Sequence, residues 1–159
     1  MSKDVTMRPV DAIYGARAEC YVTMDGNRYN LMQMVNFDSH FQTNIVDVPI
    51  LGRISKGHKM TGGSGSWSGT AHYNTSIFRQ WILNYKRTGI LVPFEIQVSN
   101  EDESASVGRQ TIILKDCLPN DITLAKFDAN DSVLDEDISG TFDDFEMPES
   151  FTNLSGMSF

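Results

Sequence analysis

The chain has 159 residues, of which 40% are hydrophobic and 10% aromatic, a composition that suits one folded domain and excludes a disordered chain. No run approaches the roughly 20 apolar residues that a membrane-spanning helix takes, and no apolar export signal follows the N-terminus, so membrane anchoring is not expected. The net charge of −8 predicts a surface that repels the phosphates of DNA rather than binding them.

Charge is distributed unevenly along the sequence. Residues 1–90 contain ten Lys and Arg against six Asp and Glu, which gives +4, whereas residues 91–159 contain three against fifteen, which gives −12. After Lys126 nine acids follow and no base. One interpretation is a solvated acidic edge that keeps the protein soluble, and the other is that the unlike-charged halves dock on further copies of the chain.

The first elements read as strands. Residues 1–17 show no clear period and are predicted to form an N-terminal arm, whereas apolar and polar side chains alternate in residues 18–24, as in a half-buried strand. Asp25-Gly26 follows, and a second alternating run continues to Phe37. An Asp-Gly pair between two such runs predicts a β-hairpin, because both turn positions take a positive φ.

Strand character resumes around residues 41–48 and then stops. Residues 49–65 are dense in Gly, Ser and Lys and have no packing pattern, so they are predicted to form a long exposed loop. Loops of this length in compact domains are usually functional or disordered. Residues 66–73 alternate again, and one face of this strand collects Trp67, Gly69, Ala71 and Tyr73.

Residues 75–88 have the apolar spacing of an amphipathic helix. Asn74 or Thr75 is predicted to be its N-cap, and Gly89 is placed to end it. The rest of the chain reads as strands at 92–98, 107–114, 122–127 and 139–147, with turns at 100–106 and 118–121, a bulge at Asp143-Asp144 and a loosely held C-terminal tail at 152–159.

This pattern predicts a mainly β fold, an antiparallel β-sandwich or barrel with one flanking α-helix. The β-domain is expected to span residues 18–151. Cys20 and Cys117 are far apart in the sequence and are predicted to be small core residues rather than a disulfide or a redox pair.

No pattern in the sequence supports catalysis. The Gly-rich stretch at 57–69 lacks the Gly-Lys-Ser/Thr ending of a phosphate loop and leads into a strand, not a helix. The serines lack a Gly-x-Ser-x-Gly elbow, and the C-terminal acids are flanked by further acids instead of by an apolar pocket that would separate their pKa values. We therefore expect no enzyme and no cofactor.

Metal binding is not expected either. Asp128, Asn130 and Ser132 resemble the start of a calcium loop, but Val133 stands where the loop needs glycine and Ser139 where it needs glutamate. The three histidines are isolated from one another and have no Cys or carboxylate at the spacing of metal ligands; they are His40, His58 and His72.

Several segments in a fixed order resemble a known family. They are Leu51-Gly52, 59–65, 69–73, a helix containing Tyr85 and ending at Gly89, Phe94, Gly108-Arg109-Gln110, Leu124-Ala125 and 138–146. In order and spacing this set is similar to the tail tube proteins of PBSX-like contractile phages and phage-tail-like bacteriocins, over roughly residues 18–151. Gly140 is a departure, because a larger strand residue is expected there.

The resemblance implies a structural subunit of a contractile tail or tail-like particle. Such subunits form hexameric rings, which stack into a hollow tube that sheath contraction drives through the target envelope. The implied partners are further copies of the chain, the sheath protein, and baseplate and tail-terminator proteins, with DNA passing without specific binding. The particle would be assembled in the bacterial cytoplasm and released by lysis.

Three sets of residues are predicted to serve assembly. The first is the cationic part of the 49–65 segment, expected to reach a neighbouring ring: Arg53, Lys56, His58 and Lys59. The second supplies acids to interfaces: Asp135, Glu136, Asp137, Asp143, Asp144 and Glu146. The third would line the bore with polar groups: Asn30, Asn36, Asp38, Ser66, Ser68 and Thr70.

Two other functions are compatible with the same fold class. A tube protein of a type VI secretion system or another contractile injection system would share the fold. A secreted carbohydrate-binding β-sandwich would also have many strands and a Trp, but it would stay monomeric and bind sugar.

Overall fold

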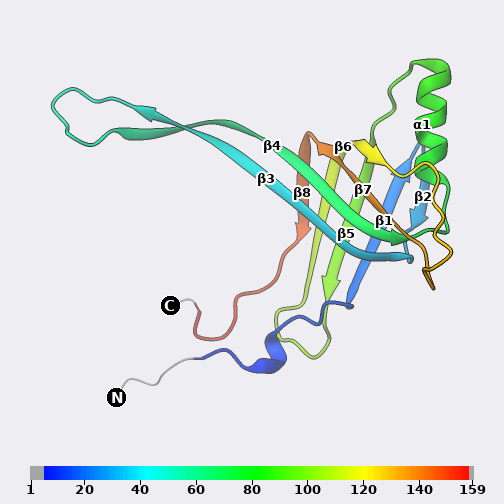
Figure 1. Ribbon diagram of the computed structural model, residues 1–159. Coiled ribbons are helices and arrows are strands. Elements are labelled where there is room, and N and C mark those ends of the chain that lie inside the picture. Colours follow the sequence, from blue (N-terminus) through cyan, green and yellow to red (C-terminus); the bar gives the residue numbers. More distant parts are fainter. Residues whose placement is uncertain (1–5, 158–159) are drawn as a thin grey trace. The chain divides into compact units, whose positions relative to one another are not determined.

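The structure of the protein is a computed structural model that describes residues 6–157 (Figure 1). The described residues form eight strands, one α-helix and one short 3-10 turn. They cluster into two compact units: unit 1 comprises residues 6–32, 92–116 and 145–157, and unit 2 comprises residues 33–91 and 117–144. The first five residues of the predicted N-terminal arm and the last two of the predicted tail lie outside the described residues.

Unit 1 is an antiparallel sheet that carries the 3-10 turn Pro9–Asp11. Its strands are β1 (Ala18–Met24), β2 (Asn27–Asn30), β5 (Phe94–Glu101), the first part of β6 (Arg109–Ile122) and most of β8 (Asp144–Glu149). The strand order is β2-β1-β5-β6, and β8 also pairs with β6. The predicted hairpin is confirmed, because Met24 pairs with Asn27 across a turn in which Asp25 and Gly26 have φ of 48° and 78°.

The core of unit 1 follows from the period of its strands. Cys20, Val22 and Met24 alternate into the interior from β1, and Ile96 of β5 lies opposite Val22. Burial raises the pKa of the Cys20 thiol to about 12, which makes it a neutral packing residue and not a nucleophile. Cys117 of unit 2 is buried as well, and both are free cysteines, so their predicted place in the core is confirmed.

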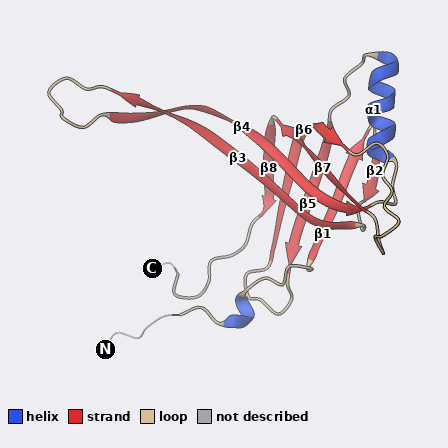
Figure 2. Cartoon of the chain, in the orientation of Figure 1, coloured by secondary structure: helices blue, strands red, loops and turns tan. Residues whose placement is uncertain are grey.

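Unit 2 consists of β3 (Met34–Val48), β4 (Gly57–His72), β7 (Asp135–Phe142), the end of β6, and α1 (Ile77–Thr88). Its strand order is β6-β7-β4-β3, and every pair is antiparallel (Figure 2). Trp67 and Ala71 of β4 are buried with Ile138 and Phe142 of β7, as the alternation in residues 66–73 predicts. The Trp67 indole N–H donates a hydrogen bond to the Thr141 carbonyl at 3.1 Å, so the ring is buried with its polar atom satisfied.

Gly140 is explained by its surroundings in β7. It pairs with Trp67 of β4 on one side and with Pro119 of β6 on the other. A Cβ at position 140 would collide with the carbonyl oxygen of Leu118 and would lie 2.6 Å from the indole ring of Trp67. Glycine is required there because the backbone of β6 and a large aromatic ring both come too close for a side chain.

The helix α1 begins one or two residues later than predicted. Its N-cap is Ser76, whose carbonyl accepts the first hydrogen bond of the helix from the Gln80 N–H at 2.8 Å. Gly89 ends the helix as predicted, with φ of 69° and its N–H donated to the Tyr85 carbonyl at 2.8 Å. Phe78 is the fully buried residue of this helix.

The predicted loop at 49–65 is wrong in its second half. Only residues 49–56 connect the strands, and residues 57–65 belong to β4, where Gly57 pairs with Val48 and Gly65 with Phe41. The sequence does not predict this strand because almost every side chain in it, on both faces, is exposed. A strand without a buried face does not show the alternation of apolar and polar residues by which strands are recognised. Glycine backbones nevertheless form ladder hydrogen bonds as well as other residues do.

The remaining differences from the predicted elements concern where strands begin and end. The second alternating run is two strands, because β2 ends at Asn30 and β3 starts at Met34. The predicted turn at 118–121 is an irregularity within β6, with a register shift between Pro119 and Asp121, and residues 123–134 form no strand. Proline has no N–H to donate, so it suits such a bulge. The predicted bulge at residues 143–144 is a break between β7 and β8.

Candidate assembly surfaces

The most exposed part of unit 2 is a two-stranded ribbon that we call the hairpin arm, residues 42–64. In it β3 and β4 pair only with each other, from Gln42 opposite Ser64 to Val48 opposite Gly57. From Gly65 onward, β4 also pairs with β7, and the ribbon becomes part of the sheet. Figure 1 shows the arm as the long cyan projection of β3 and β4.

A bulge interrupts the pairing within the arm. The register shifts between Thr43 and Ile45, and Gly62 on the opposite strand has φ of 100°. The left-handed conformation is one that glycine adopts without a steric penalty. Bulges increase the local twist of a ribbon, so this irregularity is expected to twist the arm.

The four residues predicted from the sequence to contact a neighbouring ring all lie at the end of this arm. We define the arm tip as residues 49–60; it contains Arg53, Lys56 and Lys59 and no acid, which gives +3. His58 lies 3.3 Å from the carboxylate of Asp47 across the ribbon. All four side chains are exposed, and among the described residues no ion pair involves the other three.

The arm tip also exposes large apolar side chains, which the sequence analysis missed. Leu51 and Ile54 are fully exposed, at 102% and 107%, and Met60 is 60% exposed. Ile45, elsewhere in the hairpin arm, is 62% exposed. Apolar residues scattered singly on a surface are ordinary, but a contiguous set rimmed by charges is typical of a protein interface. The available signal was the presence of Leu51 and Ile54 in the same short segment as Arg53 and Lys56.

Five of the six predicted lumen residues share one face of the unit 2 sheet. Asn36 lies opposite Thr70 and Asp38 opposite Ser68 in the β3–β4 register, and Ser66 precedes them on the same face of β4. The Asn36 amide oxygen accepts the Thr70 N–H at 3.1 Å, and the Thr70 hydroxyl donates to Asp137 at 2.7 Å.

The opposite face of β4 carries the buried Trp67 and Ala71, so this polar face is the outward one. A shallow depression on it is lined by Asn36, Ser68, Thr70, Asp121, Asp137 and Ser139. The sixth predicted residue, Asn30, is exposed on β2 of unit 1.

The predicted interface acids have different surroundings. Asp135 lies 2.7 Å from the ring of His72, and Glu146 lies 2.7 Å from the ammonium group of Lys115. Asp137 accepts the Thr70 hydroxyl, and Asp143 and Asp144 are exposed at the break between β7 and β8. Glu136 alone among the six is buried, with 1% of its surface exposed.

Glu136 is the centre of an internal network that fixes α1 to β7. The Arg79 guanidinium of α1 donates to the Glu136 carboxylate at 2.5 Å and to the Thr123 carbonyl at 3.0 Å. The same guanidinium donates to the Thr75 carbonyl and lies 4.5 Å above the ring of Tyr73. A buried carboxylate with this many charge-assisted contacts orients the elements that supply them.

The described residues bear on the expectations for metal binding and membrane anchoring. Within residues 6–157 no three His, Cys, Asp or Glu side chains are grouped in a way that would hold a metal ion. The segment that resembles a calcium loop forms a turn instead, in which the Asp128 carboxylate accepts the Asn130 N–H at 3.0 Å. None of the helices in this part of the chain is long and apolar enough to cross a bilayer.

Comparison with known families identifies what these surfaces belong to. The profile of a family described as phage tail tube protein matches residues 5–149, which is most of the chain. The chain belongs to the phage tail tube protein family. The resemblance inferred from the sequence is therefore confirmed, and membership of a structural family implies a subunit of a tail tube rather than a catalyst.

Two Bacillus subtilis (strain 168) proteins are similar to this tail tube protein. The phage-like element PBSX protein XkdM is 28% identical over 130 residues, which cover 82% of this chain and 87% of XkdM. The uncharacterized protein YqbM is 29% identical over 126 residues, which cover 79% of this chain and 84% of YqbM.

Solved structures show the same fold at low sequence identity. A chain of the sheath–tube complex of the extracellular contractile injection system PVC matches with a TM-score of 0.67 and 14% identity, covering 87% of this chain and 92% of that one. A chain of the anti-feeding prophage baseplate matches with a TM-score of 0.62 and 13% identity, covering 92% and 97%. The predicted class, mainly antiparallel β with a flanking helix, is confirmed as a tail-tube fold.

Proposed function

We propose that this tail tube protein forms hexameric rings that stack into the hollow inner tube of a contractile phage tail or tail-like particle. The observation that carries the proposal is the hairpin arm, which projects from the sheet with exposed apolar side chains and no covering layer. An isolated two-stranded ribbon is at best marginally stable in water. Contact with further copies of the chain would bury the apolar side chains of the tip. It would also give the two strands of the arm a further element to pack against.

Unpaired sheet edges support association within a ring. Among the described residues β3 pairs only with β4, and β2 pairs only with β1, so each presents one free edge. A free edge fifteen residues long, such as that of β3, is a template for pairing with another chain. In a closed ring each subunit would present one edge to each neighbour, which satisfies both without open-ended growth.

Electrostatics support contacts between rings and an inert bore. The cationic arm tip would meet acids of an adjacent subunit, for which Asp135, Asp143, Asp144 and Glu146 are exposed or half-buried candidates. The polar face around Asp38 would line the bore, where hydroxyls, amides and carboxylates would let DNA pass without binding.

The wider assembly follows from the tube role. The similar chain in PVC is part of a sheath–tube complex, and that in the anti-feeding prophage is part of a baseplate. We therefore propose a sheath protein, a baseplate and a tail terminator as partners of this chain. Assembly would take place in the bacterial cytoplasm, and lysis would release the particle.

Polymerisation of the purified protein tests the proposal. The wild-type chain should form rings or tubes at high concentration, visible by negative-stain electron microscopy and sedimenting in analytical ultracentrifugation. Replacing Arg53, Lys56 and Lys59 together by Glu should abolish the tubes, because the arm tip would then repel the acids it meets. A matched control, Lys86→Glu with Arg87→Glu at the exposed end of α1, should leave them intact.

A carbohydrate-binding module would give the opposite result. It would remain a monomer at every concentration, with or without the substitutions. A monomeric wild-type chain, even in the presence of its baseplate and sheath proteins, contradicts the tube proposal.

A further inference from the structure

A second exposed surface of unit 2 complements the arm tip in charge and apolar character. We call it the acidic loop, residues 123–134, which connects β6 to β7. Phe127 is 91% exposed, and Leu124 and Val133 are exposed as well. The loop thus presents three large apolar side chains to solvent.

The carboxylates of this loop have no cationic partner. Asp128 accepts only a backbone N–H, that of Asn130, and within residues 6–157 no ion pair involves Asp128 or Asp131. The one base of the loop, Lys126, turns its ammonium group onto the Asp135 carbonyl at 2.8 Å. Asp128 and Asp131 are therefore free to attract a cation from another molecule.

Three acids elsewhere in the C-terminal third are engaged by basic side chains of their own chain. Glu136 pairs with Arg79, Glu146 with Lys115, and Glu149 accepts two hydrogen bonds from Arg109 at 2.5 and 2.9 Å. The acidic loop thus combines what these positions lack, namely uncompensated charge next to exposed apolar side chains. The arm tip has the same combination with the opposite sign. It carries +3 beside Leu51 and Ile54, whereas the acidic loop, with two acids and Lys126, carries −1.

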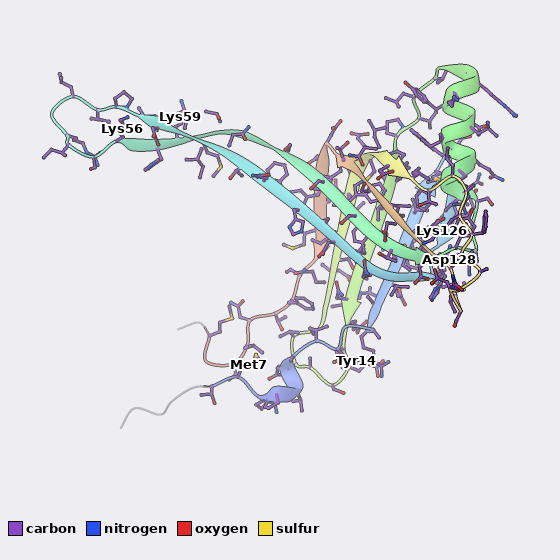
Figure 3. The ribbon with its side chains drawn as sticks, viewed as in Figure 1. Met7, Tyr14, Lys56, Lys59, Lys126 and Asp128 are labelled. Carbon is purple, nitrogen blue, oxygen red and sulfur yellow. The ribbon has the colours of Figure 1, made fainter. Side chains whose placement is uncertain are left out.

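The two surfaces cannot meet within one chain. The acidic loop is fixed at the end of β4, where the Tyr73 N–H donates to the Leu134 carbonyl at 2.9 Å and His72 pairs with Asp135. The arm tip is at the start of β4, sixteen residues away, which is about 50 Å at the rise of a strand. Figure 3 shows the separation, with Lys56 and Lys59 at one end of unit 2 and Lys126 and Asp128 at the other.

We infer that the arm tip of one copy docks on the acidic loop of a second copy. Leu51 and Ile54 would pack on Phe127 and Val133, and the cations of the tip would face Asp128 and Asp131. Because the two surfaces differ and lie at opposite ends of the unit, the contact is heterologous and propagates from copy to copy. The inference rests on the proposed tube and names the receiving surface within it.

Charge reversal on each side tests the pairing. Asp128→Lys with Asp131→Lys should lower the yield of sedimenting tubes about tenfold or more. Arg53→Glu with Lys56→Glu should do the same, because either variant places charges of the same sign on both sides of the contact. All four substitutions in one chain should restore the yield to within about threefold of wild type. The charges of the two surfaces are then exchanged, so that the surfaces again attract each other. Glu101→Lys with Glu103→Lys, two exposed acids of unit 1, is the matched control and should polymerise normally.

The outcomes separate this inference from the proposed function. Failure of the wild-type chain to form tubes contradicts the tube itself. Normal tubes from the acidic-loop variant, or no recovery when both surfaces are reversed, overturn the docking while the tube proposal stands. Far-ultraviolet circular dichroism of each monomer establishes that the variants are folded, as expected for exposed positions.

Cross-linking supplies a second readout. A chain with Ile54→Cys and Val133→Cys, treated with a short bismaleimide in assembled tubes, should give a ladder of multimers on a denaturing gel. Either single variant should give none, because Cys20 and Cys117 are buried. Tubes that form normally but yield no ladder from the double variant contradict the docking.

Discussion

The two halves of β4 share a neighbour on one side and differ on the other. Residues 57–64 pair with β3 alone, and almost all of their side chains are exposed. Residues 65–72 pair with β3 and β7, and Gly65, Trp67, Gly69 and Ala71 alternate into the interior. One continuous strand is thus an exposed ribbon at its start and a core element at its end.

The two halves of β4 differ in the elements that pack on them, not in their own amino-acid composition. Both halves are rich in Gly and Ser, which give little strand preference of their own. In the second half Trp67 supplies a large buried surface and the third strand supplies further hydrogen bonds. In the first half the chain supplies neither, so the arm depends on contacts with other molecules. The following predictions test that division.

The largest contrast is expected between Trp67 and Ile54. Trp67→Ala should lower the free energy of unfolding by about 3–5 kcal/mol, because it leaves a cavity and removes the hydrogen bond to Thr141. Ile54→Ala should change it by less than about 0.5 kcal/mol, because the side chain is fully exposed in the monomer. Urea titrations of the monomer measure both. Equal effects would contradict the division between core and arm.

A somewhat smaller loss is expected from the ion pair beside the packed half of β4. Glu136→Leu alone should cost about 3 kcal/mol, because it leaves the Arg79 guanidinium, itself mostly buried, without its carboxylate. Arg79→Met together with Glu136→Leu should recover much of that loss, since no charge is then left uncompensated. A double-mutant cycle in urea measures the coupling, and additive losses would argue against the pair.

Gly140→Ala tests the close approach of β6 and Trp67. We expect a loss of about 1–3 kcal/mol, because the added methyl group would overlap the Leu118 carbonyl and the indole ring. Gly15→Ala, at a position where an added Cβ meets no atom within 4 Å, is the matched control. Its effect should be neutral or slightly stabilising, and thermal melts of the two variants provide the comparison.

The smallest effect is a pH dependence in unit 1, away from the arm. Hydrogen bonds from the Tyr14 and Ser104 N–H groups, at 3.0 Å each, lower the pKa of Asp102 below its usual range. The folded pKa is thus below the unfolded value of about 3.9, so the stabilisation is present above that pH and is lost as the pH falls through the folded pKa.

Asp102→Asn should therefore flatten the fall of the urea midpoint between about pH 5 and pH 2. Gln42→Ala, a neutral exposed change in the arm, should keep the wild-type slope. A slope that is the same in wild type and Asp102→Asn would show that this carboxylate does not couple to folding.

The sequence alone determined the elements whose pattern is local. The period of β1, the Asp25-Gly26 turn, the buried face at Trp67 and the end of α1 at Gly89 were all predictable, because side-chain spacing and backbone φ preferences act over a few residues. The order of the segments also indicated the tail tube family. The cationic residues of the arm tip were found through their charge.

Only the tertiary structure decided what depends on distant partners. The strand at 57–65 exists because β3 lies opposite it, and Gly140 is needed because β6 and Trp67 meet over it. Glu136 is predicted from the sequence to be an interface acid, but it lies in the interior, where it pairs with Arg79. The sequence also could not predict that the arm tip and the acidic loop lie at opposite ends of β4. That separation depends on which strands pair, and the spacing of residues in the sequence does not determine strand pairing.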